Sequence, residues 1–252
     1  MNRPGALALI AALLASAPVD AAPDSKSCGA PRELTQLREG LPRTATRLAR
    51  HESLKVVAIG SSSTVGYGAT SASFSYPNQF AAEMRRRLPR EPIEVFNKGV
   101  GGEISSEMVA RFDRDVFAAD PDLVIWQVGT NAVLHDHDIG YHSEVVRYGL
   151  MRLKDAGIDV ILMDMQFAPT VLAHPLYREM EHSLAAVAKE QGVAFFHRFA
   201  LMQNWVESGQ LDFTAMLSPD GLHLNDLTYG CIGRILADAV VDRAAPLVAS
   251  GK

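Results

Sequence analysis

The chain has 252 residues, 48% of them hydrophobic, and its formal net charge at pH 7 is −5. A mildly acidic chain gives no electrostatic case for binding nucleic acid or an anionic membrane surface, so neither partner is expected. Once an N-terminal leader is set aside, about 230 residues remain, which suits one α/β domain rather than two.

The first residues have the order of a secretory signal peptide. The opening MNR carries one positive charge, the apolar stretch GALALIAALLASAPV follows, and small residues come next. This order predicts cleavage after Ala21 or Ala22, and we assign residues 1–21 to the signal peptide. The apolar stretch is too short and too rich in alanine for a comfortable membrane span. We therefore expect an exported protein, periplasmic or secreted, with no stable membrane insertion after cleavage.

Residues 22–52 are rich in proline, arginine and polar side chains, and we interpret them as an N-terminal extension with one short helix. The main domain is assigned to residues 53–247. Cys28 and Cys231 would meet an oxidising environment after export. A disulfide that ties the extension to the last helix and a pair of unpaired thiols both fit the sequence, which does not decide between them.

From residue 55 onward, short apolar runs alternate with amphipathic stretches. Strands are predicted at residues 55–60, 93–97, 122–129, 158–165 and 193–197. Helices are predicted at residues 76–89, 104–120, 141–157, 176–192 and 225–243. This alternation predicts an α/β fold with three layers, in which a parallel five-stranded sheet carries helices on both faces. Such a sheet binds ligands beyond the carboxyl ends of its strands, so we seek the chemistry in the residues that follow each strand.

Four polar or glycine-rich blocks occupy those positions. GSSST (residues 60–64) follows the first strand, NKGVGGE (97–103) the second and GTNA (129–132) the third, while SPDGLHLN (218–225) precedes the last helix. Each block alone is a common turn signal. Their joint occurrence in this order is more informative than any single block.

In that order the blocks resemble the SGNH (GDSL-type) hydrolase superfamily, whose members are esterases, lipases and other acyl-removing enzymes. The resemblance covers about residues 55–242 and implies a flavodoxin-like fold. The second and fourth blocks match, with Asp220 and His223 at the family spacing. In the first and third blocks, Ser61 and Ala132 stand where the family has aspartates. Neither aspartate belongs to the catalytic set, so their replacement bears on the support of two loops more than on the chemistry.

Which of three consecutive serines is the nucleophile depends on the register of the first block. Alignment of Gly60 with the family glycine places Ser62 at the nucleophile position, in preference to Ser61 and Ser63. The stretch is not the Gly-x-Ser-x-Gly elbow of α/β-hydrolases, because Thr64 occupies the place of the second glycine.

The resemblance implies a catalytic set of Ser62, His223 and Asp220. A serine hydroxyl needs an adjacent base to take its proton, which His223 would do, and Asp220 would orient the imidazole and stabilise its cation. The negative charge of the tetrahedral intermediate needs donors. These would be the backbone N–H groups of Ser62 and Gly102 and the side-chain amide of Asn131.

The expected function is therefore that of an exported serine esterase, which hydrolyses carboxylic esters through an acyl-enzyme. Its substrate would be a small-molecule or glycan ester with a small acyl group, such as acetyl on a polysaccharide. Lysophospholipase, thioesterase and acyltransferase activities on the same triad stay open. No cofactor and no metal are expected, and the oligomeric state is not predicted.

Two interpretations lie outside this class. The hydroxyl-rich SSSTVGYG (61–68) could form a phosphate loop in a flavin- or phosphate-binding module, but the Walker and dinucleotide fingerprints are missing and Asp220 and His223 would then have no role. A non-catalytic carbohydrate-binding protein is the second, supported only by the two replaced aspartates. His135 and His137 in HDHD are potential metal ligands. We interpret the segment instead as a solvated turn, because no further ligands cluster nearby in the sequence.

Overall fold

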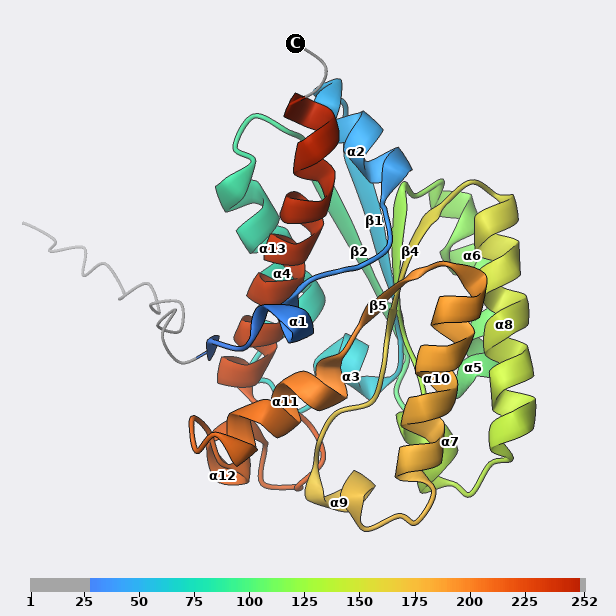
Figure 1. The fold of residues 1–252 in the computed structure, drawn as a ribbon, viewed down its shortest axis with the longest axis vertical. Coiled ribbons are helices and arrows are strands. Elements are labelled where there is room, and N and C mark those ends of the chain that lie inside the picture. The colour runs from blue at the N-terminus through green and yellow to red at the C-terminus, as the bar shows by residue number, and fades with distance from the viewer. Residues whose placement is uncertain (1–27, 250–252) are drawn as a thin grey trace, which may run out of the picture.

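The computed structural model describes residues 28–249, so the predicted signal peptide, residues 1–21, lies outside the described residues. Within residues 28–249 the chain forms a five-stranded, all-parallel sheet with the strand order β2-β1-β3-β4-β5 (Figure 1). This topology confirms the predicted flavodoxin-like α/β fold. The strands are β1 (Leu54–Gly60), β2 (Ile93–Gly99), β3 (Leu123–Gln127), β4 (Asp159–Met163) and β5 (Ala194–Phe196).

Helices cover both faces of the sheet (Figure 1). On one face, α13 (Asp226–Ala249) packs against α4 (Tyr76–Arg87) and α2 (Pro42–Ala49). On the other, α8 (Ile139–Asp155) packs against α10 (Tyr177–Gln191). Every residue of β3 and β4 is buried, as expected of central strands between two helical layers.

The segment predicted as one helix at residues 104–120 is broken in the structure. It forms α5 (Ser105–Ala110), α6 (Phe112–Asp115) and the 3-10 helix η3 (Phe117–Ala119). The first break falls at Arg111, whose φ of −107° and ψ of 9° leave the α-helical region. Its buried guanidinium bonds to groups on both sides of the break, and these contacts outweigh the local helical preference.

Several short helices were not predicted from periodicity, because a segment of three to five residues carries too little pattern to be recognised. They are α3 (Ser62–Val65), η2 (Ala72–Phe74), α7 (Thr130–Leu134), α9 (Pro169–Leu172) and α12 (Phe213–Met216). The longer α11 (Arg198–Glu207) was not predicted either. No helix among residues 28–249 is both long enough and apolar enough to cross a membrane.

The described part of the N-terminal extension packs on the main domain. It contains two helices, α1 (Arg32–Thr35) and α2, where the sequence indicated one. Leu37, Leu41 and Leu48 are buried in the common core. The described part of the extension therefore adds to the hydrophobic core.

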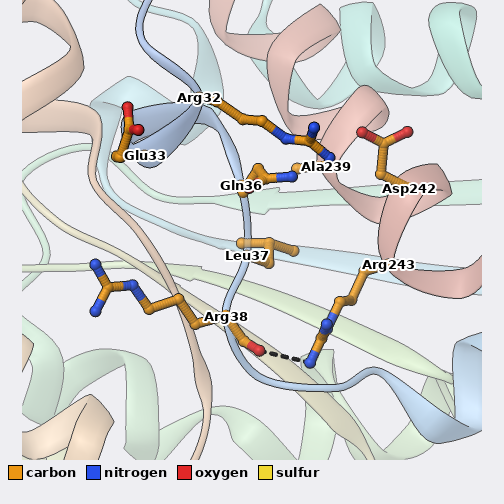
Figure 2. A pocket seen from close by; sticks show the side chains of 8 residues that line it. All are labelled: Arg32, Glu33, Gln36, Leu37, Arg38, Ala239, Asp242 and Arg243. Atoms are coloured by element: carbon orange, nitrogen blue, oxygen red, sulfur yellow. Dashed lines mark hydrogen bonds between the residues drawn. The ribbon is translucent and has the colours of Figure 1, made fainter.

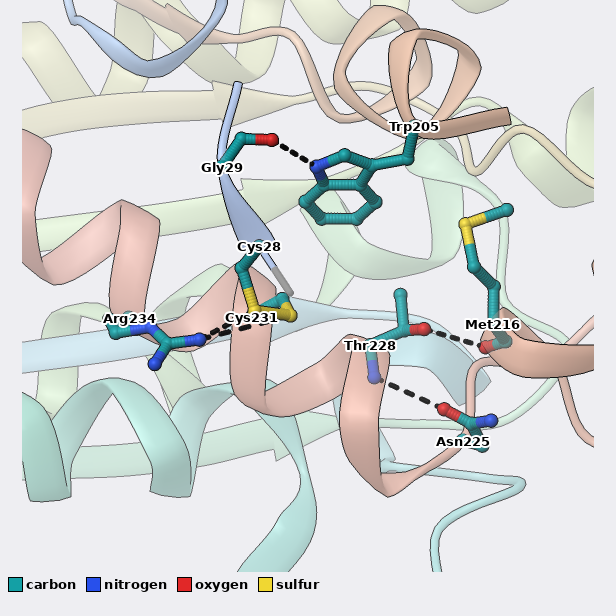
Figure 3. The surroundings of a disulfide bond; sticks show 8 residues. All are labelled: Cys28, Gly29, Trp205, Met216, Asn225, Thr228, Cys231 and Arg234. Carbon is teal, nitrogen blue, oxygen red and sulfur yellow. Dashed lines mark hydrogen bonds between the residues drawn. A yellow bond between two sulfur atoms is a disulfide. The ribbon is translucent and has the colours of Figure 1, made fainter. Parts of the chain in front are cut away.

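A disulfide joins this extension to α13 (Figure 3). It links Cys28 to Cys231, whose Cα atoms lie 5.4 Å apart and which are separated by 203 residues in the sequence. Beside it, the indole N–H of Trp205 donates a hydrogen bond to the Gly29 carbonyl oxygen at 2.9 Å. Of the two alternatives left open by the sequence, the structure adopts the disulfide.

Candidate active site

The chain turns from β1 into α3 within two residues, and this turn presents Ser62. Of the three consecutive serines, Ser61 and Ser63 are buried at 2% and 1% exposure, whereas Ser62 is partly exposed. Ser62 is the first residue of α3. The fold therefore makes Ser62 the serine of this loop that a substrate can approach.

Ser62 lies in a hydrogen-bonded series with His223 and Asp220. His223 Nε2 is 2.8 Å from Ser62 Oγ, and His223 Nδ1 is 2.6 Å from Asp220 Oδ2. A carboxylate only accepts hydrogen bonds, so the ring proton lies on Nδ1 and leaves Nε2 as the acceptor for the Ser62 hydroxyl. The structure thus brings His223 to Ser62, which lies 161 positions earlier in the sequence, and to Asp220, which lies three positions earlier.

The Asp220 carboxylate is held in its charged form by its neighbours. Burial opposes ionisation, but hydrogen bonds from the His223 side chain and from the Leu222 and His223 backbone N–H groups hold the pKa of Asp220 well below its usual value. Ser218 Oγ also donates to Asp220 Oδ1, at 2.8 Å. The carboxylate is therefore fixed in orientation and suited to stabilise an imidazolium.

Gly102 lies in the loop that follows β2, and Asn131 lies in α7, which follows β3. Gly102 has φ of +82°, a conformation that favours glycine, and a Cβ at this position would meet no atom within 4 Å, so its backbone faces open space. Asn131 Nδ2 donates to the carbonyl oxygen of Glu103, the residue after Gly102, at 2.9 Å. An amide nitrogen carries two hydrogens, so one remains for another acceptor. No acceptor among residues 28–249 is bonded to the backbone N–H groups of Ser62 or Gly102.

Gln127, at the end of β3, holds the loop that carries Ser61, Ser62 and Thr64. Its Oε1 accepts from the Ser61 backbone N–H at 3.0 Å, from Ser61 Oγ at 2.9 Å and from Thr64 Oγ1 at 3.3 Å. Ala132, at the other replaced position, is buried in the core at 1% exposure and carries no polar atom that needs a partner. Sequence reasoning missed Gln127, although a polar residue at the end of an apolar strand is a feature that the sequence shows.

Arg111 braces the loop that contains Gly102. Its guanidinium bonds to the Glu103 carboxylate at 2.8 Å and to Asp115 at 3.0 Å, and Nη2 reaches the Gly60 carbonyl oxygen at 3.4 Å. Because the Glu103 carbonyl accepts from Asn131, this ion pair fixes the backbone against which Asn131 is placed. Sequence reasoning also missed Arg111.

A second buried link connects α7 to the loop that carries His223. Gln166 Oε1 accepts from Thr130 Oγ1 at 2.8 Å and from Arg198 Nη2 at 2.9 Å, and its amide nitrogen donates to the Leu222 carbonyl oxygen at 3.4 Å. Thr130 precedes Asn131 and Leu222 precedes His223 in the chain. Gln166 therefore links the first residue of α7 to the loop that carries His223.

The HDHD segment does not assemble a metal centre in the described chain. The ring centroids of His135 and His137 are 6.1 Å apart, and Asp136 bonds to His174 at 2.8 Å. Among residues 28–249, no group of three or more His, Cys, Asp or Glu side chains is placed to hold a metal ion.

Neither of two hollows in the described chain is lined by Ser62 or His223. Figure 2 shows one of about 660 Å³ between the extension and α13, where Arg243 donates to the Arg38 carbonyl oxygen. It contains none of the predicted site residues, and charged side chains of the extension surround it. Another hollow, of about 370 Å³, is lined by Pro219 and Gly221, the two neighbours of Asp220. The candidate site is thus defined by its hydrogen-bonded side chains rather than by the volume of a hollow.

A family model described as a non-GDSL lipase-like family matches residues 27–246. This match confirms the resemblance drawn from the four blocks, and the description agrees with Ser61 in place of the family aspartate. No curated protein matches the chain.

Similar folds occur among solved structures. A two-domain esterase (CEX) active on acetylated mannans has 20% sequence identity and a TM-score of 0.68 over 85% of this chain and 57% of that protein, so this chain spans little more than half of its length. Axe2, an acetylxylan esterase from Geobacillus stearothermophilus, has 22% identity and a TM-score of 0.60 over 76% of this chain and 94% of that protein. At these identities the similarity establishes a shared fold.

Proposed function

This chain belongs to the non-GDSL lipase-like family, and we propose that it is an exported serine esterase that hydrolyses carboxylic esters with small acyl groups. O-acetyl groups on a glycan are the favoured substrates. The observation that carries the proposal is the hydrogen-bonded series from the partly exposed Ser62 through His223 to the ionised Asp220. This geometry supports the roles of nucleophile for Ser62, base for His223 and orienting group for Asp220.

In the proposed reaction, Ser62 Oγ attacks the ester carbonyl carbon while its proton passes to His223 Nε2. The carbonyl electrons move to oxygen, and the tetrahedral intermediate collapses when His223 gives the proton to the departing alcohol oxygen. Water then attacks the acyl group on Ser62 and loses a proton to His223. Collapse of this second intermediate releases the acid and returns the proton to Ser62.

The charge on the carbonyl oxygen needs fixed donors. The backbone N–H groups of Ser62 and Gly102 and the second amide hydrogen of Asn131 are the proposed oxyanion hole. Arg111 and Gln127 support it by holding the loops on either side. Because these donors are already in place before charge develops, they stabilise the transition state without reorganisation.

The hydroxyls of the loop after β1 favour this proposal over phosphate binding. Ser61 and Thr64 are turned toward Gln127, and Ser62 is bonded to His223. A phosphate loop instead presents its donors to the ligand. The arrangement also gives Asp220 and His223 the partners that a flavin- or phosphate-binding module would not need.

Export and the acyl group are proposed on separate grounds. The leader-like N-terminus suggests export, and the disulfide between Cys28 and Cys231 is typical of an oxidising compartment. The proteins of similar fold are described as active on acetylated mannans and as an acetylxylan esterase, which supports acetyl over longer acyl groups.

The test combines covalent labelling with a substrate series. A serine-directed fluorophosphonate should label the wild-type protein at Ser62, and nitrophenyl esters should be hydrolysed fastest at acetate and progressively more slowly toward octanoate. Acetylated oligosaccharides and a lysophospholipid are assayed in parallel. A protein that is neither labelled nor active on any ester would contradict the proposal, and a preference for long acyl chains or for the lysophospholipid would overturn the small-acyl assignment.

A further inference from the structure

An exposed aromatic ring lies beside the imidazole of the candidate site. Tyr67 is 52% exposed, and its ring centroid is 5.7 Å from that of His223, with the two planes tilted by 60°. The other exposed large hydrophobic residues in the described chain are Val100 and three residues of α8: Tyr141, Tyr148 and Met151. Tyr67 is thus the exposed ring that contacts a residue of the proposed triad.

The backbone that carries Tyr67 is packed directly on the catalytic loop. A Cβ added to Gly68 would lie 2.9 Å from His223 Cβ, so glycine is required for this approach, and its φ of +89° requires glycine as well. The Tyr67 N–H donates to the Ser62 carbonyl oxygen at 3.0 Å, and the Tyr67 carbonyl oxygen accepts from Tyr229 Oη at 2.7 Å. Tyr67 is therefore rigidly placed relative to both Ser62 and His223.

The ring itself is held at its hydroxyl end. A Cβ added to Gly101 would lie 3.1 Å from Tyr67 Oη and 3.2 Å from Cε2 and Cζ, so the edge of the ring rests on glycine backbone. About half of the side chain stays open to solvent. A ring that is fixed on one side and open on the other loses little conformational entropy when a ligand packs on it.

The direction of proton transfer tells which part of an ester lies near this ring. His223 must deliver a proton to the departing alcohol oxygen, so the alcohol has to lie within hydrogen-bond reach of the imidazole. Tyr67, whose exposed ring contacts the imidazole, is therefore placed to border the alcohol portion of the ester. The acyl portion is instead oriented by the donors around its carbonyl oxygen, proposed at Gly102 and Asn131.

The surroundings of Tyr67 suit a sugar ring better than an alkyl chain. A pyranose has an apolar C–H face that stacks on an aromatic ring and a rim of hydroxyls that bonds to a phenol oxygen. Beside the ring lies the exposed backbone of Gly101, and next to it in the chain Val100 is a single exposed apolar side chain flanked by glycines. A long alkyl alcohol would leave most of its surface in water there.

We propose that Tyr67 is the platform on which the alcohol portion of the substrate stacks, and that this alcohol is a sugar residue. The inference rests on the proposed esterase function and assigns the leaving-group side of that site. Tyr67 acts here as a specificity-determining residue.

The test compares two acetate esters that differ in the alcohol. Acetylated xylo- or manno-oligosaccharide carries a sugar, and ethyl acetate carries an alcohol too small to stack, so acetate release is measured from both. Tyr67→Leu should lower kcat/KM on the acetylated oligosaccharide by about tenfold, mainly through KM, and change kcat/KM on ethyl acetate by less than about twofold. Tyr67→Phe keeps the aromatic face and should stay within about threefold of wild type on both. Tyr148→Leu, a similarly exposed tyrosine on α8, is the matched control and should match wild type on both.

Each alternative result has a distinct meaning. An equal loss on both esters would show that Tyr67 positions His223 and would overturn the platform. Unchanged activity of Tyr67→Leu on the oligosaccharide would overturn it as well. If the wild type hydrolyses ethyl acetate but no acetylated sugar, the sugar assignment fails while the esterase stands. Loss of all ester hydrolysis and of fluorophosphonate labelling in the wild type would mean that the proposed function itself is wrong.

Discussion

Gln127 Oε1 accepts hydrogen bonds from both the backbone N–H and the hydroxyl of Ser61, at 3.0 Å and 2.9 Å. Ser61 stands where the superfamily has an aspartate, and Gln127 on the neighbouring strand β3 accepts the hydrogen bonds that fix the loop of the candidate nucleophile. The strand that supplies Gln127 is fully buried, which makes the support rigid.

Gln127→Leu should lower both stability and activity. It leaves the Ser61 N–H and hydroxyl, which are buried at 2% exposure, without an acceptor, and each such group costs about 1–3 kcal/mol. The free energy of unfolding from urea titration and kcat on nitrophenyl acetate should fall together. Ser61→Ala removes only the hydroxyl donor and should have a much smaller effect. Wild-type kcat in Gln127→Leu would show that the loop does not depend on this bond.

Ser62→Ala should leave a folded protein whose ester turnover is lower by about three orders of magnitude or more, because the members of a triad act as a unit. Ser63→Ala is the matched control, since Ser63 is buried at 1% exposure and the hydrogen bond to His223 comes from Ser62. Circular dichroism establishes that both variants are folded. If Ser63→Ala or Ser61→Ala abolishes turnover while Ser62→Ala remains active, the register of the nucleophile is wrong.

The fold was predictable because its information is local. Each strand is a short apolar run and each long helix an amphipathic one, so the alternation can be seen without tertiary contacts. The break at Arg111 could not be seen in this way, because it depends on Glu103 and Asp115 as ion-pair partners. The short helices α3 and α7 lack the length on which periodicity depends.

The candidate site was likewise predictable where its residues lie close together in the sequence. Asp220 and His223 lie in one turn, so their spacing alone suggests their contact, whereas Ser62 needed the family register. The supports Gln127 and Gln166 were missed because their partners are distant in the sequence: Ser61 is 66 positions from Gln127, and Leu222 is 56 from Gln166. The catalytic roles themselves stay predictions.

Removal of the disulfide should destabilise the protein. The bond closes a separation of 203 residues, and loss of such a cross-link costs about 2–5 kcal/mol by increasing the entropy of the unfolded chain. The double variant Cys28→Ser/Cys231→Ser should therefore unfold at lower temperature than the wild type. A reductant should lower the thermal midpoint of the wild type and leave that of the variant unchanged. Equal midpoints for the wild type with and without reductant would contradict the bond.

His142 should make stability depend on pH. It is 3% exposed, and burial, aided by His137, lowers its pKa to about 4, while Nδ1 bonds to Ser105 Oγ at 2.9 Å. The unfolded chain binds this proton near its ordinary pKa of about 6.5. Between these values the unfolded state binds more protons, so stability is lost as the pH falls from about 6.5 to about 4, by about 3 kcal/mol in total.

Urea titrations at pH 7, 5 and 4 measure this loss. His142→Asn has no group that titrates in this window and should show a flatter dependence of unfolding free energy on pH. His135→Asn replaces an exposed histidine and is the control, with a slope close to that of the wild type. An unchanged slope in His142→Asn would assign the pH dependence to other groups.

Asn131 offers the sharpest separation between a catalytic and a structural role. If its second amide hydrogen binds the developing oxyanion, Asn131→Ala should lower kcat by about two to three orders of magnitude and change KM much less, because the donor gains strength only as charge appears on oxygen. Its hydrogen bond to Glu103, at 2.9 Å, predicts a second effect, a loss of about 1 kcal/mol of stability. Asn131→Asp is the informative companion, since a carboxylate keeps the size but cannot donate and would repel the oxyanion, so it should be at least as inactive as Asn131→Ala. A lowered thermal midpoint with intact kcat in Asn131→Ala would leave only the structural bond to Glu103 and remove Asn131 from the oxyanion hole.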